Sequence, residues 1–234
     1  MVKPRKKGFD TMKKKPILII LAAALILAIG AAVVVILHEK PAKAPPTTPE
    51  PEAPQFQLTA DLSLSALFPY SGKFVEDGSD EPVENIAAVR LTNSGETDYQ
   101  YLEFTVTAGE TDYTFIASAV HAGASVTVLS RERQPYASAA ITGGKVTTQA
   151  EYMTPPSLQE ELLEVYVSPG TVNLKNKTDR DLPGTFTVYY KNVDENGLFG
   201  GITYRASVEG MKAGEIRQQT SAHLGQVMDI TYEE

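Results

Sequence analysis

TFTVYYK at residues 185–191 is followed by NVDENG at residues 192–197. Threonine, valine and aromatic residues are favoured in β-strands, whereas asparagine, aspartate and glycine favour turns. The same succession of short strand-like runs and turn-like clusters extends from Phe56 to the C-terminus. This pattern predicts a mainly β fold of antiparallel strands. The expected strands are residues 86–93, 101–107, 111–119, 125–130, 163–167, 171–176, 185–191, 201–208, 215–220 and 227–232.

The strand-like runs occur twice in the same order. VRLTN at residues 89–93 resembles VNLKN at 172–176, and FTV occurs at both 104–106 and 186–188. Shorter matches pair residues 114–118 with 203–207, 122–123 with 213–214, and 144–146 with 225–227. The differences in spacing fall in predicted loops, where insertions cost little free energy. The repeat predicts two tandem β-sandwich domains, residues 56–154 and residues 155–234.

PPSLQEELL at residues 155–163 lies between the two copies. Ser157 and Glu160 have the spacing of a helix-capping box ahead of a short apolar face. We therefore expect one or two helical turns to join the domains, with the double proline stiffening the junction.

Three motifs occur together in the second copy: FTVYY at residues 186–190, NVDENG at 192–197 and MKAGE at 211–215. With them, residues 163–232 resemble the FxLYD-type immunoglobulin-like domains of bacterial envelope proteins, in which an aromatic strand motif leads into an Asp/Asn-Gly hairpin. The resemblance implies two tandem immunoglobulin-like β-sandwich domains and no catalytic residue. The first copy departs from it, because FTVTAG at residues 104–109 lacks the tyrosines and the longer hairpin.

An uncharged run of twenty-one residues extends from Ile17 to Leu37 and includes Leu25 and Gly30. At about 1.5 Å per helical residue it spans roughly 30 Å, the thickness of the hydrocarbon core of a bilayer. We therefore expect one transmembrane helix at residues 16–38, anchored in the lipid bilayer.

The basic residues lie mainly before this run, and Lys13, Lys14 and Lys15 are the nearest of them. The positive-inside rule then places a basic tail, residues 1–15, in the cytoplasm and the C-terminal domains outside it. This arrangement predicts a single-pass protein of the cell membrane with an uncleaved signal-anchor.

A cleaved secretory signal is the alternative, because AKA at residues 42–44 has the small-x-small pattern of a cleavage site. The apolar run is longer than that of a typical signal, and Pro45 disfavours cleavage there, so we favour the anchor. Ala24, Ala28 and Ala32 form a small-residue stripe that would allow weak self-association through the helix, although alanine is simply abundant in this run.

A proline-rich linker is expected at residues 39–55, where it would hold the domains away from the membrane. The formal net charge is -8, but basic residues concentrate before residue 44 and acidic residues after residue 55. Opposite charges at the two ends fit opposite sides of a membrane and argue against nucleic-acid binding. The chain has no cysteine, which excludes disulfides and favours a bacterial envelope over an exported eukaryotic ectodomain.

The sequence has few candidates for catalytic or metal-binding residues. The three histidines are His38, His121 and His223, and none has the partners of a catalytic set. EDGSDE at residues 76–81 and DENG at 194–197 could supply calcium ligands, but neither fits an EF-hand, and solvated turns explain both more simply. We predict no catalytic, cofactor-binding or metal-binding residue.

These features together predict a membrane-anchored extracytoplasmic interaction module whose partner is an envelope protein or a glycan. A structural spacer or assembly subunit of an envelope complex is the alternative. An extracytoplasmic hydrolase with paired carboxylates ranks last, because the chain has no tryptophan to line a sugar-binding cleft and its domains are small.

Overall fold

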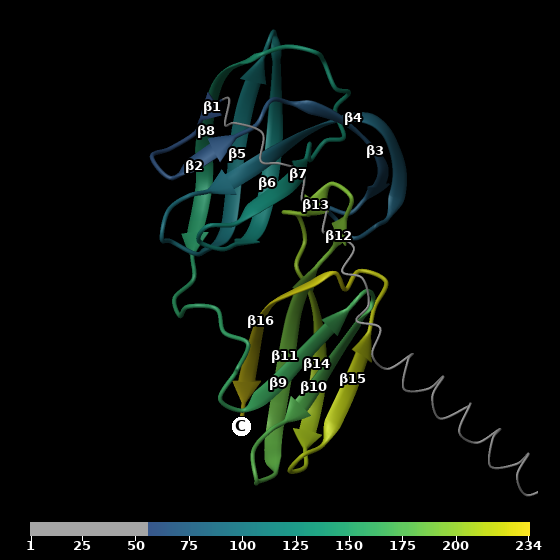
Figure 1. The fold of residues 1–234 in the computed structure, drawn as a ribbon. Helices are drawn as coiled ribbons and strands as arrows, with labels where there is room; N and C mark the ends of the chain where they lie inside the picture. The colour runs from purple at the N-terminus through teal and green to yellow at the C-terminus, as the bar shows by residue number, and fades with distance from the viewer. Residues whose placement is uncertain (1–55) are drawn as a thin grey trace, which may run out of the picture. The chain divides into compact units, whose positions relative to one another are not determined.

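The computed structural model describes residues 56–234 (Figure 1). Several predicted features lie outside these residues: the basic tail at 1–15 with Lys13, Lys14 and Lys15, the transmembrane helix at 16–38 with Ile17, Leu25, Gly30 and Leu37, and the linker at 39–55. Within the described residues, no helix has the length and apolar character needed to cross a bilayer.

The described residues form strands and no helix, which confirms the mainly β fold (Figure 1). All ten runs that were predicted as strands from their composition overlap strands of the structure, although the run at residues 201–208 begins three residues before β14. Their alternating buried and exposed residues explain why, because successive side chains of a strand point to opposite faces.

The N-terminal β region, residues 56–152, contains two antiparallel sheets. Its strands are β1 (Phe56–Gln57), β2 (Leu62–Leu64), β3 (Phe68–Phe74), β4 (Glu81–Asn93), β5 (Tyr99–Ala108), β6 (Thr111–Val120), β7 (Ser125–Leu129) and β8 (Ile141–Glu151). The long strand β4 pairs with β2, β3 and β7, and β5 pairs with β6 and β8. A hydrophobic core built around Leu91, Phe104 and Phe115 contains buried residues from both sheets.

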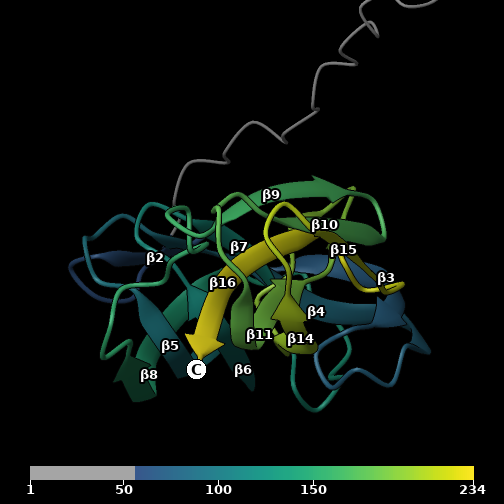
Figure 2. The same ribbon diagram turned by 90° about the horizontal axis from the view of Figure 1, so that it is seen from below.

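The C-terminal β region, residues 157–234, also has two antiparallel sheets, of three strands each, and a separate two-stranded hairpin. Its strands are β9 (Leu163–Ser168), β10 (Thr171–Asn176), β11 (Leu182–Lys191), β12 (Val193–Asp194), β13 (Gly197–Leu198), β14 (Tyr204–Met211), β15 (Ile216–Thr220) and β16 (Gln226–Glu233). The sheets β15-β10-β9 and β14-β11-β16 form two layers (Figure 2) around a second core that includes Leu174, Phe186 and Ile230.

Equivalent asparagines show the repeat in atomic detail. Asn93 ends β4 and Asn176 ends β10, and both side chains are fully buried. Each Nδ2 donates to the carbonyl oxygen four residues further on and to a carbonyl in the turn that precedes the next strand of its sheet. The acceptors are Thr97 O (2.8 Å) and His121 O (3.1 Å) for Asn93, and Arg180 O (2.8 Å) and Lys212 O (3.0 Å) for Asn176.

The helical turns expected between the copies are absent, and this prediction was wrong. Residues 160–162 form a single turn, in which Gln159 O accepts hydrogen bonds from the amides of Leu162 and Leu163, both at 2.8 Å. The Ser157 hydroxyl does contact the Glu160 carboxylate at 3.3 Å, as the capping spacing suggested. However, β9 begins at Leu163, and its residues pair with β10. The residues that would have extended a helix are therefore part of a strand.

Candidate functional site

A segment of the C-terminal region, residues 196–201, inserts between two strands of the N-terminal region. Gly200 donates its amide to Thr127 O of β7 at 2.7 Å, and Gly200 O accepts the amide of Ser118 of β6, also at 2.7 Å. The segment thus hydrogen-bonds to one strand from each sheet of the N-terminal region. Figure 1 shows the β12–β13 hairpin lying beside β7.

Phe199 anchors this segment by burial. Its side chain is 3% exposed and lies in a third hydrophobic cluster with Tyr70, Phe74 and Leu129 of the N-terminal region. The rings of Tyr70 and Phe199 meet edge to face at a centroid distance of 5.8 Å. Full burial of a phenylalanine stabilises such a contact by about 2–3 kcal/mol.

Lys191 lies beneath the inserted segment and is fully buried. Its ammonium group donates three hydrogen bonds, to Gly201 O (2.7 Å), Gly200 O (2.8 Å) and the Ser118 hydroxyl (3.1 Å). Burial lowers the pKa of Lys191 to about 7, while the negative charge of Glu76 opposes the shift.

Glu76 approaches the same segment from the N-terminal region. Its Oε1 accepts the amide of Leu129 at 2.8 Å, and its Oε2 lies so close to Gly201 that a side chain there would collide with it. Burial of the carboxylate raises the pKa of Glu76 to about 8, against the hydrogen bond from Leu129 and the charge of Lys191. Residue 201 must therefore be glycine for the two regions to meet in this way.

A second polar contact joins the regions nearby. Asp80 Oδ2 lies 2.9 Å from His223 Nε2 and 3.2 Å from Lys73 Nζ. The His223 ring stacks on Tyr204 with a centroid distance of 4.3 Å and an interplanar angle of 3°. The pKa of Asp80 is lowered, chiefly by its hydrogen bond to His223.

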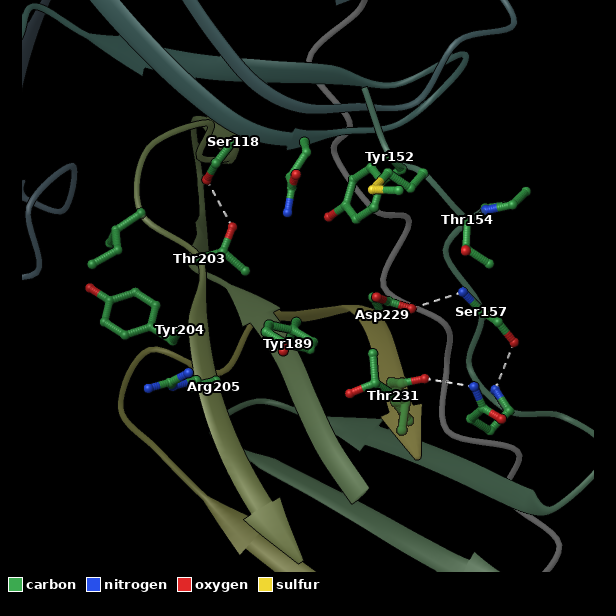
Figure 3. Close-up of a pocket in the computed structure, with 16 residues that line it drawn as sticks. Ser118, Tyr152, Thr154, Ser157, Tyr189, Thr203, Tyr204, Arg205, Asp229 and Thr231 are labelled. Carbon is green, nitrogen blue, oxygen red and sulfur yellow. Dashed lines mark hydrogen bonds between the residues drawn. The ribbon is translucent and has the colours of Figure 1, made fainter. Parts of the chain in front are cut away.

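These contacts leave a groove of about 850 Å³ where the two regions meet (Figure 3). It has the size of a small-molecule or short-chain site. The lining residues come from the ends of β5 and β6, the connection after β8, strands β11, β14 and β16, and the two residues before β14. They are Gln100, Ser118, Tyr152, Met153, Thr154, Pro155, Ser157, Gln159, Tyr189, Ile202, Thr203, Tyr204, Arg205, Asp229, Ile230 and Thr231.

The outer face of the sheet β14-β11-β16 forms one wall of the groove. Arg205 and Asp229 are the direct cross-strand neighbours of Tyr189, one on each side. Figure 3 shows them on opposite sides of the Tyr189 ring. In the next row along these strands, Thr187 is flanked in the same way by Ser207 and Thr231. This wall is therefore a polar face with one aromatic ring between opposite charges.

The opposite wall is the connection between the two regions. Ser157 donates its amide to Asp229 Oδ1 at 2.9 Å, and Gln159 Nε2 donates to Ile230 O at 2.9 Å, so the connection is fixed to β16. Burial and the nearby Asp229 carboxylate raise the pKa of Tyr152 to about 12. The Met153 side chain, by contrast, is fully exposed at the groove.

His121, His223 and the two acidic loops do not line the groove, and His38 lies outside the described residues. His121 packs edge-on against Tyr152 at 6.0 Å, and burial lowers its pKa, whereas His223 contacts Asp80. Within residues 56–234, no three His, Asp or Glu side chains converge as metal ligands would.

The two acidic turns differ from each other. At residues 194–197 the predicted turn is observed as the tip of the β12–β13 hairpin. The loop at residues 76–81 was expected to be solvated throughout, which is wrong for Glu76, whose carboxylate meets Leu129 and Gly201. Asp77 at the same loop pairs with Arg133 at 3.1 Å.

Sequence reasoning did not find the groove, because Tyr189, Arg205 and Asp229 lie on three different strands and meet only through strand pairing. The one signal for it in the sequence was the presence of eleven tyrosines, which strand preference alone also explains. No protein-family model, curated protein or solved structure matches the chain.

Proposed function

We propose that this chain is a membrane-anchored extracytoplasmic interaction module that binds an envelope or surface component in the groove between its two β regions. In this proposal, the segment from Ile17 to Leu37 is the single-pass anchor, and the two regions are tandem immunoglobulin-like domains presented outside the cytoplasm.

The observation that carries the proposal is the composition of the groove. Binding sites combine aromatic surface with a few well-placed polar groups, and tyrosine and arginine are enriched where proteins contact partners. Tyr152, Tyr189 and Tyr204 supply the aromatic surface, and Arg205 and Asp229 supply the charges. Their arrangement offers contact area and hydrogen-bonding groups to a ligand.

The sheet arrangement supports the immunoglobulin-like part of the proposal. Each region has two antiparallel sheets, and the chain passes between them in the same order in both. Strands β4 and β5 of the N-terminal region correspond to β10 and β11 of the C-terminal region. Facing antiparallel sheets with Greek-key connections are typical of immunoglobulin-like sandwiches. The uncharged run after Lys13, Lys14 and Lys15 supports the anchor and its orientation.

Sedimentation with isolated envelope fragments tests the proposal, using the full-length chain in detergent. We expect the wild-type chain to co-sediment and Tyr189→Ala to bind about tenfold more weakly, the typical effect of removing a central interface tyrosine. Tyr166→Ala is the matched control, because Tyr166 is a half-exposed tyrosine on β9 that does not line the groove. Protease or glycan-hydrolase treatment of the fragments identifies the class of partner.

Absence of wild-type binding to every fraction would refute the proposal. Equal binding by wild type and Tyr189→Ala would refute the groove as the binding site.

A spacer or assembly subunit is a second candidate, favoured by the inserted segment and the buried Lys191 that fix the two regions to each other. The two functions differ in what they require of the chain. In cells that lack the wild-type chain, a spacer would tolerate Tyr189→Ala but would fail when the junction is disrupted at Lys191. An interaction module would fail with either variant.

A further inference from the structure

The charges of the groove are few and balanced. Among the described residues that line it, Arg205 and Asp229 alone carry a charge at neutral pH. The remaining lining is aromatic, aliphatic or uncharged polar. A ligand that fits this lining has one group of each sign and no net charge, because an unpaired charge inside a partly enclosed site is costly.

Both charged side chains have bonding capacity left for a ligand. No carboxylate of the described residues lies within ion-pair distance of Arg205. Asp229 accepts one hydrogen bond through Oδ1, from the amide of Ser157, which leaves Oδ2 for a donor. Arginine pairs with carboxylates through two parallel hydrogen bonds, and a carboxylate pairs well with an ammonium group.

The separation of the two strand positions that carry the charges indicates the length of the ligand. Arg205 and Asp229 each lie opposite Tyr189 on a neighbouring strand. Directly opposed residues in antiparallel pairs are about 4.5–5.5 Å apart, so the two Cα atoms are separated by roughly 9–11 Å. An extended chain covers about 3.3–3.6 Å per residue, so three residues match this distance.

We propose that the groove binds a short zwitterionic peptide of about three residues, with its carboxylate at Arg205 and its ammonium group at Asp229. This inference rests on the proposed function and names the chemistry of its ligand. The peptide lies across Tyr189, and the exposed Met153 and Ile202 side chains contact its aliphatic parts. A neutral glycan could hydrogen-bond to the two side chains but has no opposite charges to pair with them, and a polyanion would be repelled by the acid-rich residues after position 55.

Calorimetric titration of the full-length chain in detergent tests this inference, with trialanine as the probe. We expect trialanine to bind, and both N-acetyl-trialanine and trialanine amide to bind at least about tenfold more weakly, because each cap removes one charge-assisted contact. Arg205→Gln should bind trialanine and its amide equally. Asp229→Asn, which keeps an acceptor for Ser157, should bind trialanine and its N-acetyl form equally.

Arg180→Gln is the matched control, because Arg180 precedes β11 at the end opposite Tyr189 and does not line the groove. It should bind all three probes as the wild type does. Equal affinity of the wild type for capped and uncapped peptides would overturn the inference, as would no binding of trialanine or tighter binding of chitotriose. If envelope fragments still bind in a Tyr189-dependent manner in those cases, the proposed function survives and only the ligand class is wrong.

Discussion

Replacing Lys191 by methionine should destabilise the contact between the two β regions. This contact, in which residues 196–201 meet β6 and β7, is called the junction below. The substitution keeps the apolar length of the side chain and removes three hydrogen bonds, to Gly200 O, Gly201 O and the Ser118 hydroxyl. It also removes the positive charge that opposes the raised pKa of Glu76.

The loss in free energy of unfolding depends on which hydrogen bonds the former partners of Lys191 keep. Breaking a buried charged arrangement by removing one partner typically costs about 3–5 kcal/mol. Here both carbonyls keep one donor, since the Ser118 amide still bonds to Gly200 O and the Ser118 hydroxyl to Gly201 O. The variant also avoids the desolvation of an ammonium group. We therefore expect Lys191→Met to lower the free energy of unfolding by about 2–3 kcal/mol.

Urea unfolding followed by tyrosine fluorescence measures this loss in the full-length chain. All eleven tyrosines lie after residue 55, and the chain has no tryptophan, so the signal reports on the β regions alone. Glu76→Gln in the Lys191→Met background should restore about 1 kcal/mol at neutral pH, because the buried Glu76 carboxyl, with its raised pKa, must take up a proton on folding, whereas the amide need not. A loss below about 1 kcal/mol for Lys191→Met, or no rescue by Glu76→Gln, would refute this account of the junction.

The pH dependence of stability gives an independent check on the same two groups. From its ordinary value of 4.5 up to about 8, folded Glu76 keeps a proton that the unfolded chain has released, so its contribution to stability falls as pH rises. From about 7 up to its ordinary value of 10.5, folded Lys191 has lost a proton that the unfolded chain keeps, so its contribution rises with pH. Together they give a minimum of stability between about pH 7 and 8. Glu76→Gln should remove the falling limb and Lys191→Met the rising limb.

Three further changes test other parts of the structure. Gly201→Ala should lower the free energy of unfolding by about 1–3 kcal/mol in the same urea assay, because the added methyl group would collide with Glu76 Oε2; unchanged stability would contradict the contact. His223→Ala should raise the lowered pKa of Asp80 toward 3.8, as followed by carboxyl NMR; in the wild type, the stability due to this contact is present above pH 3.8 and is lost as pH falls through the lowered pKa. Asn176→Ala should cost about 2–4 kcal/mol in thermal or urea unfolding, because it removes the hydrogen bonds from the buried amide to Arg180 O and Lys212 O and takes the acceptor from the Thr178 amide; a cost near zero would contradict that role.

Composition was sufficient to predict most of the strands. Runs such as TFTVYYK and FTVTA lie on the central strands β11 and β5 because β-branched and aromatic side chains suit a surface that is buried on one face. The matches VRLTN and VNLKN were informative because their last asparagine performs the same buried hydrogen bonding in both copies. A buried asparagine that makes these hydrogen bonds is needed in both copies, so it is visible in the sequence as a matched position.

Strands β1 to β3 and β8 were missed because their residues carry little strand preference. FPYSGKF of β3 contains proline and glycine, and ITGGKVTTQAE of β8 contains paired glycines and is largely exposed. Both are strands because β4 and β5 offer hydrogen-bonding edges to them, with irregular register in each case. That stabilisation comes from tertiary pairing, which local propensity does not record.

The groove and the junction are energetically linked through Ser118. Its hydroxyl contacts Gly201 O and Lys191 Nζ in the junction and Thr203 Oγ1 at 2.8 Å in the groove wall. If residues 196–201 leave their place, the adjoining residues Ile202, Thr203 and Tyr204 move with them, and the groove loses the wall that these residues form. A ligand that requires the wall must therefore stabilise the junction, by about 2.7 kcal/mol at a concentration one hundred times its dissociation constant. That gain is comparable to the loss expected from Lys191→Met, so saturating ligand should offset the substitution, whereas a ligand bound elsewhere would leave the junction of the variant as weak as before.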